Sequence, residues 1–445
     1  MSGGSRMPVT AVLTARNFRR YLLGQLTSNI GTWMQRAAQD LLVLHITGNS
    51  GSAVGVVTAL QFLPQTLFGL MGGVLADRYP KQRLLLLTQT AMGVQSLLLG
   101  LLDVTGAVNL ASVYALALAL GTATAVDSPA RNAYISELVA RECVATAVSL
   151  NAAQFNVARI LGPALAGLAV AAFGTGPVFL VNAASYLAVL YGLFTIRTDE
   201  PVEPVEPVEP NDRGRSRPGR PLLRDAFHVI ASTPELLLPI TLIAVVGTFG
   251  LNFQVTLSLV AVTVLHSGAA AFGCLSAAYA LGSLIGAIRG ASSARPPTAR
   301  RLVTATVVFG ALEAALGVMP GYGTFMALLV PTGFTAVIVT TTANALTQLH
   351  AEPRLRGRVM SVYFLVLLGG TPVGAPLVGL VSDTLGARTS LVLAGIVSAS
   401  SALALSAVPA HRLRPTPEDG SRCTRPAQGV TVGGGCGRAE ETGNG

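Results

Sequence analysis

Long apolar stretches recur along the whole 445-residue chain, separated by short polar turns. A helix that crosses a lipid bilayer needs about 20 mostly apolar residues, and twelve stretches are of that order. They lie at residues 19–45, 52–76, 82–103, 108–134, 145–172, 177–196, 236–263, 270–290, 301–319, 322–346, 358–381 and 388–409. Because non-helical backbone cannot face lipid, we predict an all-α membrane protein, a bundle of twelve transmembrane helices.

The composition of the chain supports this class. Charged residues make up 11% of the chain and hydrophobic residues 51%, whereas soluble domains carry about 25% charged residues. The net charge of +9 does not indicate a nucleic-acid partner, because the cations lie in turns rather than along one helix face. The four cysteines form no C-x-x-C pair, so no metal site is expected. No G-x-x-x-x-G-K-[ST] loop occurs, and no cofactor is expected.

Arginine and lysine residues gather in the turns after the second, fourth, sixth, eighth and tenth stretches. The opposite turns hold almost no cations, with Arg388 as the exception. Positive charges favour the cytoplasmic side, so we expect both termini there. The N-terminus has no short apolar core followed by a small-residue cleavage site, so the first stretch is expected to remain in the protein. The expected location is the cytoplasmic (plasma) membrane.

The centre of the chain interrupts the apolar pattern. Residues 201–210 read PVEPVEPVEP, and proline at every third position favours an extended polyproline II spacer. We predict a cytoplasmic segment at 1–18, a six-helix bundle at 19–196, a linker at 197–233, a second bundle at 234–411 and a disordered tail at 412–445. An offset of 212 residues pairs Asn132 with Asn344, Gly162 with Gly374, Gly167 with Gly379 and Gly174 with Gly386. Two parallel halves around one midplane site are typical of a transporter.

The turn between the second and third stretches reads GGVLADRYPKQR, residues 72–83. Gly73 and Asp77 lie four residues apart on one helix face, where the glycine allows a close helix approach and the carboxylate can cap a neighbouring helix. We predict a cytoplasmic gate in which Asp77 pairs with Arg131 in one state only. Its residues are Gly73, Asp77, Arg78, Arg83, Asp127 and Arg131. The alternative is a positive-inside loop beside a static salt bridge at a helix end.

This turn resembles the signature loop between helices 2 and 3 of the major facilitator superfamily. The segments GTWMQRAAQDLLVLHITGNS (31–50) and DSPARNAYISELVARE (127–142) resemble its branch of enterobactin-type siderophore exporters and related secretion or drug-efflux permeases. ARILGPALAG (158–167) resembles the G-P-x-x-x-G element of exporters, with Ala166 in place of a glycine. The resemblance implies two rocking bundles, a cavity lined by helices 1, 4, 7 and 10, and the proton gradient as energy source.

The first stretch is unusually polar for a membrane helix. Asn29, Trp33, Arg36 and Asp40 follow a 4-3-4 spacing, and Ser28, Thr32, Gln35 and Gln39 follow it one residue back. Such a face cannot lie against lipid. We predict a cavity wall in which Asp40 carries protons and Arg36 is able to pair with it. A fixed ion pair that holds this helix to a neighbour is the alternative.

Further polar residues complete the predicted cavity. The substrate candidates are Asn29, Gln35, Gln39, Asn156, Asn252, Gln254, Thr341 and Asn344. Arg159, in the fifth stretch, is a candidate for binding an anionic substrate or for neutralising Asp40, and a buried structural pair is the alternative.

Small residues in the fifth and eleventh stretches suit close helix contacts and bends. They are Gly162, Pro163, Gly167, Gly374, Pro376 and Gly379. These features, together with what the family resemblance implies, predict a monomeric, non-enzymatic, proton-coupled exporter of an amphipathic small molecule such as a siderophore, antibiotic or drug. Import, facilitated diffusion, and a non-transporting sensor or scaffold that docks a partner on the linker are the alternatives.

Overall fold

The computed structural model describes residues 9–196, 228–291, 296–352 and 355–407, and every regular element in these ranges is helical. The predicted polyproline spacer and the predicted disordered tail lie outside the described residues. The first half comprises α1 (Val9–Thr14), α2 (Arg16–Ile46), α3 (Gly51–Arg78), α4 (Lys81–Val104), α5 (Leu110–Leu138), the 3₁₀ turn η1 (Arg141–Cys143), α6 (Val144–Phe173) and α7 (Thr175–Thr195).

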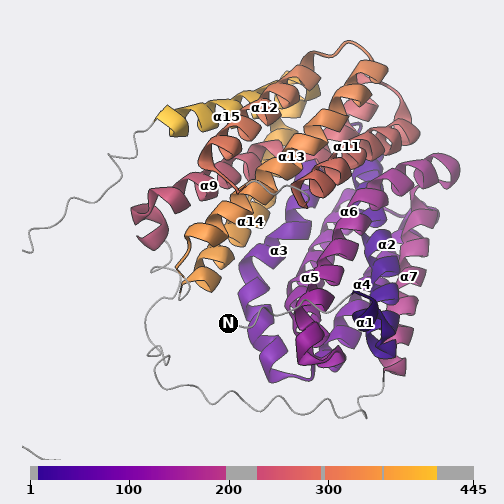
Figure 1. Ribbon diagram of the computed structural model, residues 1–445. Coiled ribbons are helices and arrows are strands. Elements are labelled where there is room, and N and C mark those ends of the chain that lie inside the picture. Colours follow the sequence, from indigo (N-terminus) through magenta and orange to yellow (C-terminus); the bar gives the residue numbers. More distant parts are fainter. Residues whose placement is uncertain (1–8, 197–227, 292–295, 353–354, 408–445) are drawn as a thin grey trace, which may run out of the picture.

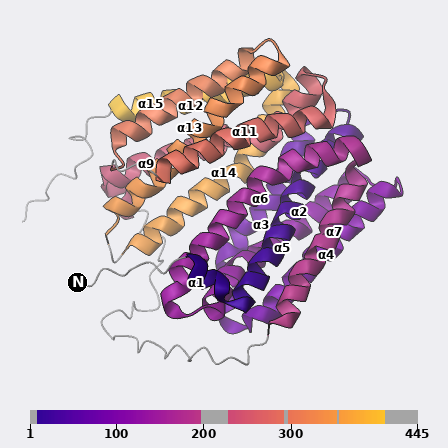
Figure 2. The ribbon, with the colours of Figure 1, turned by 45° about the vertical axis from the view of Figure 1, so that its right-hand side comes forward.

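The second half begins with a helix in four pieces, α9 (Pro234–Val245), η3 (Val246–Gly250), α10 (Phe253–Leu259) and η4 (Val260–Val264). It continues with α11 (Gly268–Ala291), α12 (Ala299–Val318), α13 (Tyr322–His350), α14 (Arg356–Leu385) and α15 (Ala387–Ala407). Figure 1 shows the two halves side by side, the first in indigo to magenta and the second in red to yellow. The same two bundles remain distinct after rotation in Figure 2.

Local signals in the sequence end and begin these helices. Ser50 accepts a hydrogen bond from the N–H of Ala53 at the start of α3, and Asn109 forms a capping box with Ser112 at the start of α5. Gly174 and Gly386 join α6 to α7 and α14 to α15 with φ of +81° and +90°. Because glycine has no Cβ, it adopts this conformation readily. The two glycines are one of the pairs at the 212-residue offset.

Eleven helical segments among the described residues are long and apolar enough to cross a membrane. The helix that falls outside this group is α2, whose polar side chains and charges lower its apolar character, although its 31 residues exceed the length required. It packs against α6 and α7 in the first bundle. The all-helical membrane fold is therefore confirmed, and the number of twelve crossings stays a prediction.

The glycine pairs at the 212-residue offset occupy equivalent contacts in the two halves. A Cβ on Gly162 would meet Trp33 and Met34 of α2, and a Cβ on Gly374 would meet Thr248 in η3, the second piece of the broken helix. Gly167 and Gly379 lie instead between the halves. A Cβ on Gly167 would meet Gly273 of α11, and a Cβ on Gly379 would meet Gly51 of α3.

The most extensive contacts between the halves are those of α3 with α14 and of α6 with α11, and α10 also touches α2 and α3. Along α3, the contact begins at Gly51 and extends past Gly55, which lies against Ala375 and Pro376, to Thr66 beside Gly369. Farther along, α3 exposes large apolar side chains, among them Leu67, Phe68 and Met71. The described structure is therefore closed between the halves at the end of the bundle where α3 begins.

Candidate functional site

The polar face of α2 is buried along its whole length. Gln35 and Gln39 are each 0% exposed. The amide of Gln35 donates to Gln95 at 2.9 Å and accepts from Asn182 at 2.6 Å. Gln39 accepts from Gln61 at 3.1 Å and donates to the backbone carbonyl of Val113 at 3.4 Å. The face marked by the 4-3-4 pattern is buried. In this structure the two amides bond to other helices of the first half, and their predicted contact with a substrate stays a prediction.

Asp40 connects the two halves of the protein. Its Oδ2 accepts a hydrogen bond of 2.8 Å from the amide nitrogen of Gln254 in α10, across the boundary between the bundles. The side chain is 0% exposed, and its Oδ1 has no hydrogen-bond partner among the described residues. Asp40 and Gln254, predicted separately as a proton carrier and a cavity residue, are therefore brought together.

Arg36 lies one helical turn before Asp40, yet the described residues contain no ion pair between them. Its guanidinium carbon lies 5.0 Å from the ring centroid of Trp33 and 4.5 Å from that of Phe62 in α3. Arg36 is 4% exposed, and its Nε has no hydrogen-bond partner within the described part of the chain. The expected pair with Asp40 is replaced in this state by cation–π contacts with two aromatic rings.

A second buried charge cluster lies nearer the opposite end of the first half. Arg131 forms an ion pair with Asp127 on its own helix and donates to Asn29 of α2 at 3.1 Å. Asp127 also accepts from Thr88 at 2.9 Å and from Gln89 at 2.7 Å, both in α4. The predicted pair of Arg131 with Asp77 is not formed here; the guanidinium pairs instead with Asp127 of its own helix, and its Nε has no partner among the described residues.

The loop predicted as the gate is exposed. Asp77, Arg78 and Arg83 are all exposed at the turn between α3 and α4. Gly73 has no neighbouring atom within 4 Å of its Cβ position, whereas a Cβ on Gly72 would meet Ala125 and Pro129 of α5. The close helix contact assigned to Gly73 from sequence is thus made by Gly72.

The helix that follows the linker is broken beside the contact with Asp40. Residues 246–250 and 260–264 form π-helical turns, and Asn252 lies between the first turn and α10. The amide nitrogen of Asn252 donates to the carbonyl of Thr248 at 2.6 Å, while its Oδ1 has no partner among the described residues. Discontinuous helices frequently form substrate and ion sites in transporters. The sequence predicted one continuous segment at 236–263, although Gly247 and Gly250 mark the break.

The remaining polar candidates form no hydrogen bond with Asp40 or Gln254 in the described part of the chain. Arg159 and Asn156 are exposed on α6, where the amide nitrogen of Asn156 donates to the carbonyl of Ala152 at 2.9 Å. On α13, Thr341 donates to the carbonyl of Val337 at 2.7 Å. Asn344 on the same helix accepts from Gln348 at 2.6 Å. These bonds stay within one helix and do not show a shared site.

Glu313 is a buried acid that the sequence did not place in the site. It is 2% exposed in α12, and its Oε2 has no hydrogen-bond partner among the described residues. A Cβ on Gly250, at the break, would lie 3.1 Å from this oxygen. Its isolation as an acid in an apolar stretch was the available signal. In the described part of the chain, no group of three or more His, Cys, Asp or Glu side chains could hold a metal ion.

The sequence is similar to a family model and to transporters of known name. Residues 8–427 match the model of a family described as transmembrane secretion effector. The staphyloferrin A transporter of Staphylococcus aureus is 29% identical over 163 residues, which are 36% of this chain and 41% of that protein. The enterobactin exporter EntS of Citrobacter koseri is 26% identical over 367 residues, 81% of this chain and 84% of that protein.

A solved structure has the same fold. It is that of a bacterial homologue of the human lysosomal transporter Spinster, in an inward-facing and occupied conformation. The TM-score is 0.66 at 16% identity, with 94% of this chain and 100% of that chain covered.

Proposed function

We propose that this chain, which belongs to the transmembrane secretion effector family of the major facilitator superfamily, exports an amphipathic small molecule in exchange for protons. The family and the relatives are transporters rather than enzymes. The observation that carries the proposal is the hydrogen bond between Asp40 and Gln254, which joins the two halves through a buried acid. Ionisable groups inside a membrane are costly and mark ion or substrate pathways.

The arginine-rich turns define the proposed orientation. With Arg78, Lys81 and Arg83 on the cytoplasmic side, both termini are cytoplasmic and the chain lies in the plasma membrane as a monomer. The closed contact between α3 and α14 then lies at the outer side, so the described structure is the inward-facing state. Opening this contact and closing the opposite end gives alternating access.

Asp40 couples protons to this movement. In the inward-facing state its Oδ2 is held by Gln254 of the other half. When the halves separate at the outer side, the carboxylate loses this donor and takes up a proton from outside. Arg36, held between Trp33 and Phe62, and Arg159 of α6 are the cations that balance the acid or an anionic group of the substrate.

The turn between α3 and α4 forms the cytoplasmic gate in the other state. Asp77, exposed here, approaches the second half when the cytoplasmic ends close. Its carboxylate then has access to the unsatisfied N–H groups at a helix start. Asp127 and Arg131, paired with each other in the inward-facing state, brace the helix on which the turn closes.

The substrate class rests on the relatives. The enterobactin exporter aligns with most of this chain, whereas the staphyloferrin A transporter aligns over about two fifths of its own length. We therefore place siderophore-like molecules first, and amphipathic antibiotics or drugs second. Import of a small solute is the alternative within the same fold.

The test is accumulation of a panel of fluorescent amphipathic compounds in cells that carry the wild-type protein or Asp77→Asn, with and without an uncoupler. We expect cells with the wild-type protein to accumulate less compound than cells with Asp77→Asn. This difference should disappear when the uncoupler is added. Asp77→Asn should reduce the flux by about tenfold to hundredfold, since a hydrogen bond to a charged group contributes about 1.5–3 kcal/mol. Accumulation that rises with the wild-type protein would establish import instead.

A further inference from the structure

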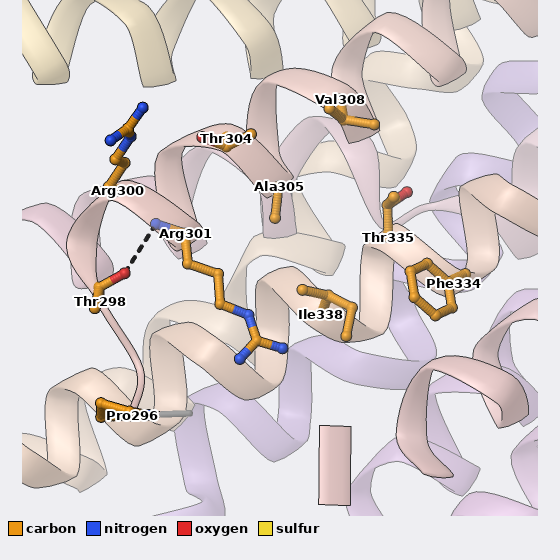
Figure 3. Close-up of a pocket in the computed structure, with 10 residues that line it drawn as sticks. All are labelled: Pro296, Thr298, Arg300, Arg301, Thr304, Ala305, Val308, Phe334, Thr335 and Ile338. Atoms are coloured by element: carbon orange, nitrogen blue, oxygen red, sulfur yellow. Dashed lines mark hydrogen bonds between the residues drawn. The ribbon is translucent and has the colours of Figure 1, made fainter. Parts of the chain in front are cut away.

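A cavity of about 640 Å³ lies between α12 and α13, lined by residues of these helices and of the turn before α12. Figure 3 shows its lining residues, with Arg300 and Arg301 in the first turn of α12 and Phe334 and Ile338 on α13. None of these residues takes part in the contact between Asp40 and Gln254. The cavity is therefore separate from the proposed transport site.

The cavity is polar at one end and apolar along its length. Arg300 and Arg301 follow directly after Ala299, where α12 begins. Ala305 and Val308 line it deeper in the helix. At 1.5 Å per residue, Val308 lies about 14 Å from the start of α12. The arginines thus lie at the depth of the membrane surface, and the apolar wall extends into the hydrocarbon region.

The lining residues carry two positive charges and no acidic side chain. Figure 3 shows Arg301 extended toward Ile338 of α13, while Arg300 points the other way from the first turn. Val308 is 42% exposed on a membrane-spanning helix, so the cavity borders the lipid. A ligand that enters from this side must carry both an anionic group and an apolar chain.

We propose that this cavity binds one anionic phospholipid. The headgroup phosphate lies beside Arg301, and Arg300 adds a second positive charge at the same end of α12. An acyl chain follows Ala305, Val308 and the α13 residues Phe334 and Ile338. Basic pockets between transmembrane helices on the cytoplasmic side suit acidic headgroups. The volume lies within the range of about 300–1,000 Å³ typical of small-molecule sites. An inorganic phosphate ion would leave the apolar wall without a contact.

The test uses the purified full-length protein in detergent, titrated with short-chain phosphatidylglycerol, phosphatidylcholine of the same chains, or inorganic phosphate. Binding is followed by the thermal unfolding midpoint and by the affinity for a labelled phosphatidylglycerol. We expect phosphatidylglycerol alone to raise the midpoint. The double variant Arg300→Gln/Arg301→Gln should weaken its binding by about fivefold for each arginine removed.

Two further variants separate the parts of the site. Val308→Trp fills the apolar wall without changing a charge, and it should weaken phosphatidylglycerol binding. Arg388→Gln, at the start of α15, removes an arginine elsewhere and should have no effect. An equal response to inorganic phosphate or to phosphatidylcholine would overturn the proposal. So would full affinity in both the double variant and Val308→Trp.

Discussion

Asp383, near the end of α14, caps the start of α3 through Ser52. Its Oδ2 accepts from the backbone N–H of Ser52 at 2.9 Å and from the Ser52 hydroxyl at 2.6 Å, while its Oδ1 accepts from the N–H of Gly51 at 2.5 Å. The first N–H groups of a helix have no partner inside the helix, and its dipole favours a negative charge there. A carboxylate of the second half thus holds a helix of the first half at the closed end.

Asp383→Asn should loosen this end of the molecule. The amide keeps one acceptor oxygen but loses the charge, so the closed population should fall by about fivefold relative to the open one, since an exposed bond of this kind contributes about 1 kcal/mol. Spin labels at the exposed positions Thr105 and Thr324 would report the distance between the halves. Asp103→Asn is the matched control, because Asp103 accepts from Thr175 within the first half. An unchanged distance distribution in Asp383→Asn would show that the cap does not hold the closed end.

Asp40→Asn should remove the dependence of transport on the pH gradient. The new side chain can still accept from Gln254, so contact between the halves is kept while the proton site is lost. Flux in vesicles with an imposed pH gradient should fall to the level measured without one. Glu313→Gln, which removes the buried acid of α12, is the control and should keep the gradient dependence. If Glu313→Gln lost the gradient dependence and Asp40→Asn kept it, Glu313 rather than Asp40 would be the residue that carries the proton.

Asp127→Asn should destabilise the protein far more than loss of a surface ion pair. Asp127 is 0% exposed and pairs with Arg131, which is 9% exposed. Removal of one partner of a buried pair costs about 3–5 kcal/mol. Glu137→Gln breaks the more exposed pair with Lys81, where about 0–1 kcal/mol is expected. Unfolding of both variants in the same detergent measures the difference, and equal midpoints would mean that water reaches the Asp127 cluster.

The helical membrane fold was predictable because its signal, apolar length, is local in sequence. The hydrogen-bond partner of each polar side chain was not predictable. Helical spacing shows on which face of a helix a residue lies, but not which other helix packs on that face. Gln35 and Asp40 lie on two neighbouring polar rows of α2, and the first bonds α4 and α7 of its own half while the second bonds α10 of the other. Asp383 was missed for a related reason, because the eleventh stretch was predicted to end at residue 381, whereas α14 continues to Leu385.

Whether Arg36 and Asp40 form the charge pair predicted from sequence also depends on their neighbours. Arg36 and Asp40 have the four-residue spacing of an ion pair, but Trp33 and Phe62 hold the guanidinium and Gln254 holds the carboxylate. Phe62 and Gln254 both lie on helices other than α2. Spacing along α2 alone therefore could not decide between the pair and its alternatives.

Gly55 tests whether close contact of α3 with α14 is needed for the cycle. A Cβ at this position would lie 2.5 Å from the carbonyl oxygen of Ala375 and 2.7 Å from the Cα of Pro376, both backbone atoms that cannot move aside. Gly69 lies on the same helix, and nothing lies within 4 Å of its Cβ position. The two glycines therefore differ in whether the other half approaches them.

Gly55→Leu should separate the halves at the closed end, whereas Gly69→Leu should not. Overpacking of a tight contact costs about 1–3 kcal/mol, which corresponds to a roughly fivefold to hundredfold loss of the closed population. Spin labels at Thr105 and Thr324 would show the longer distance, and transport should fall with it because the state with this end closed is no longer reached. If Gly55→Leu transports as well as Gly69→Leu, the helices can pass each other without the close contact, and the cycle does not require the closed end described here.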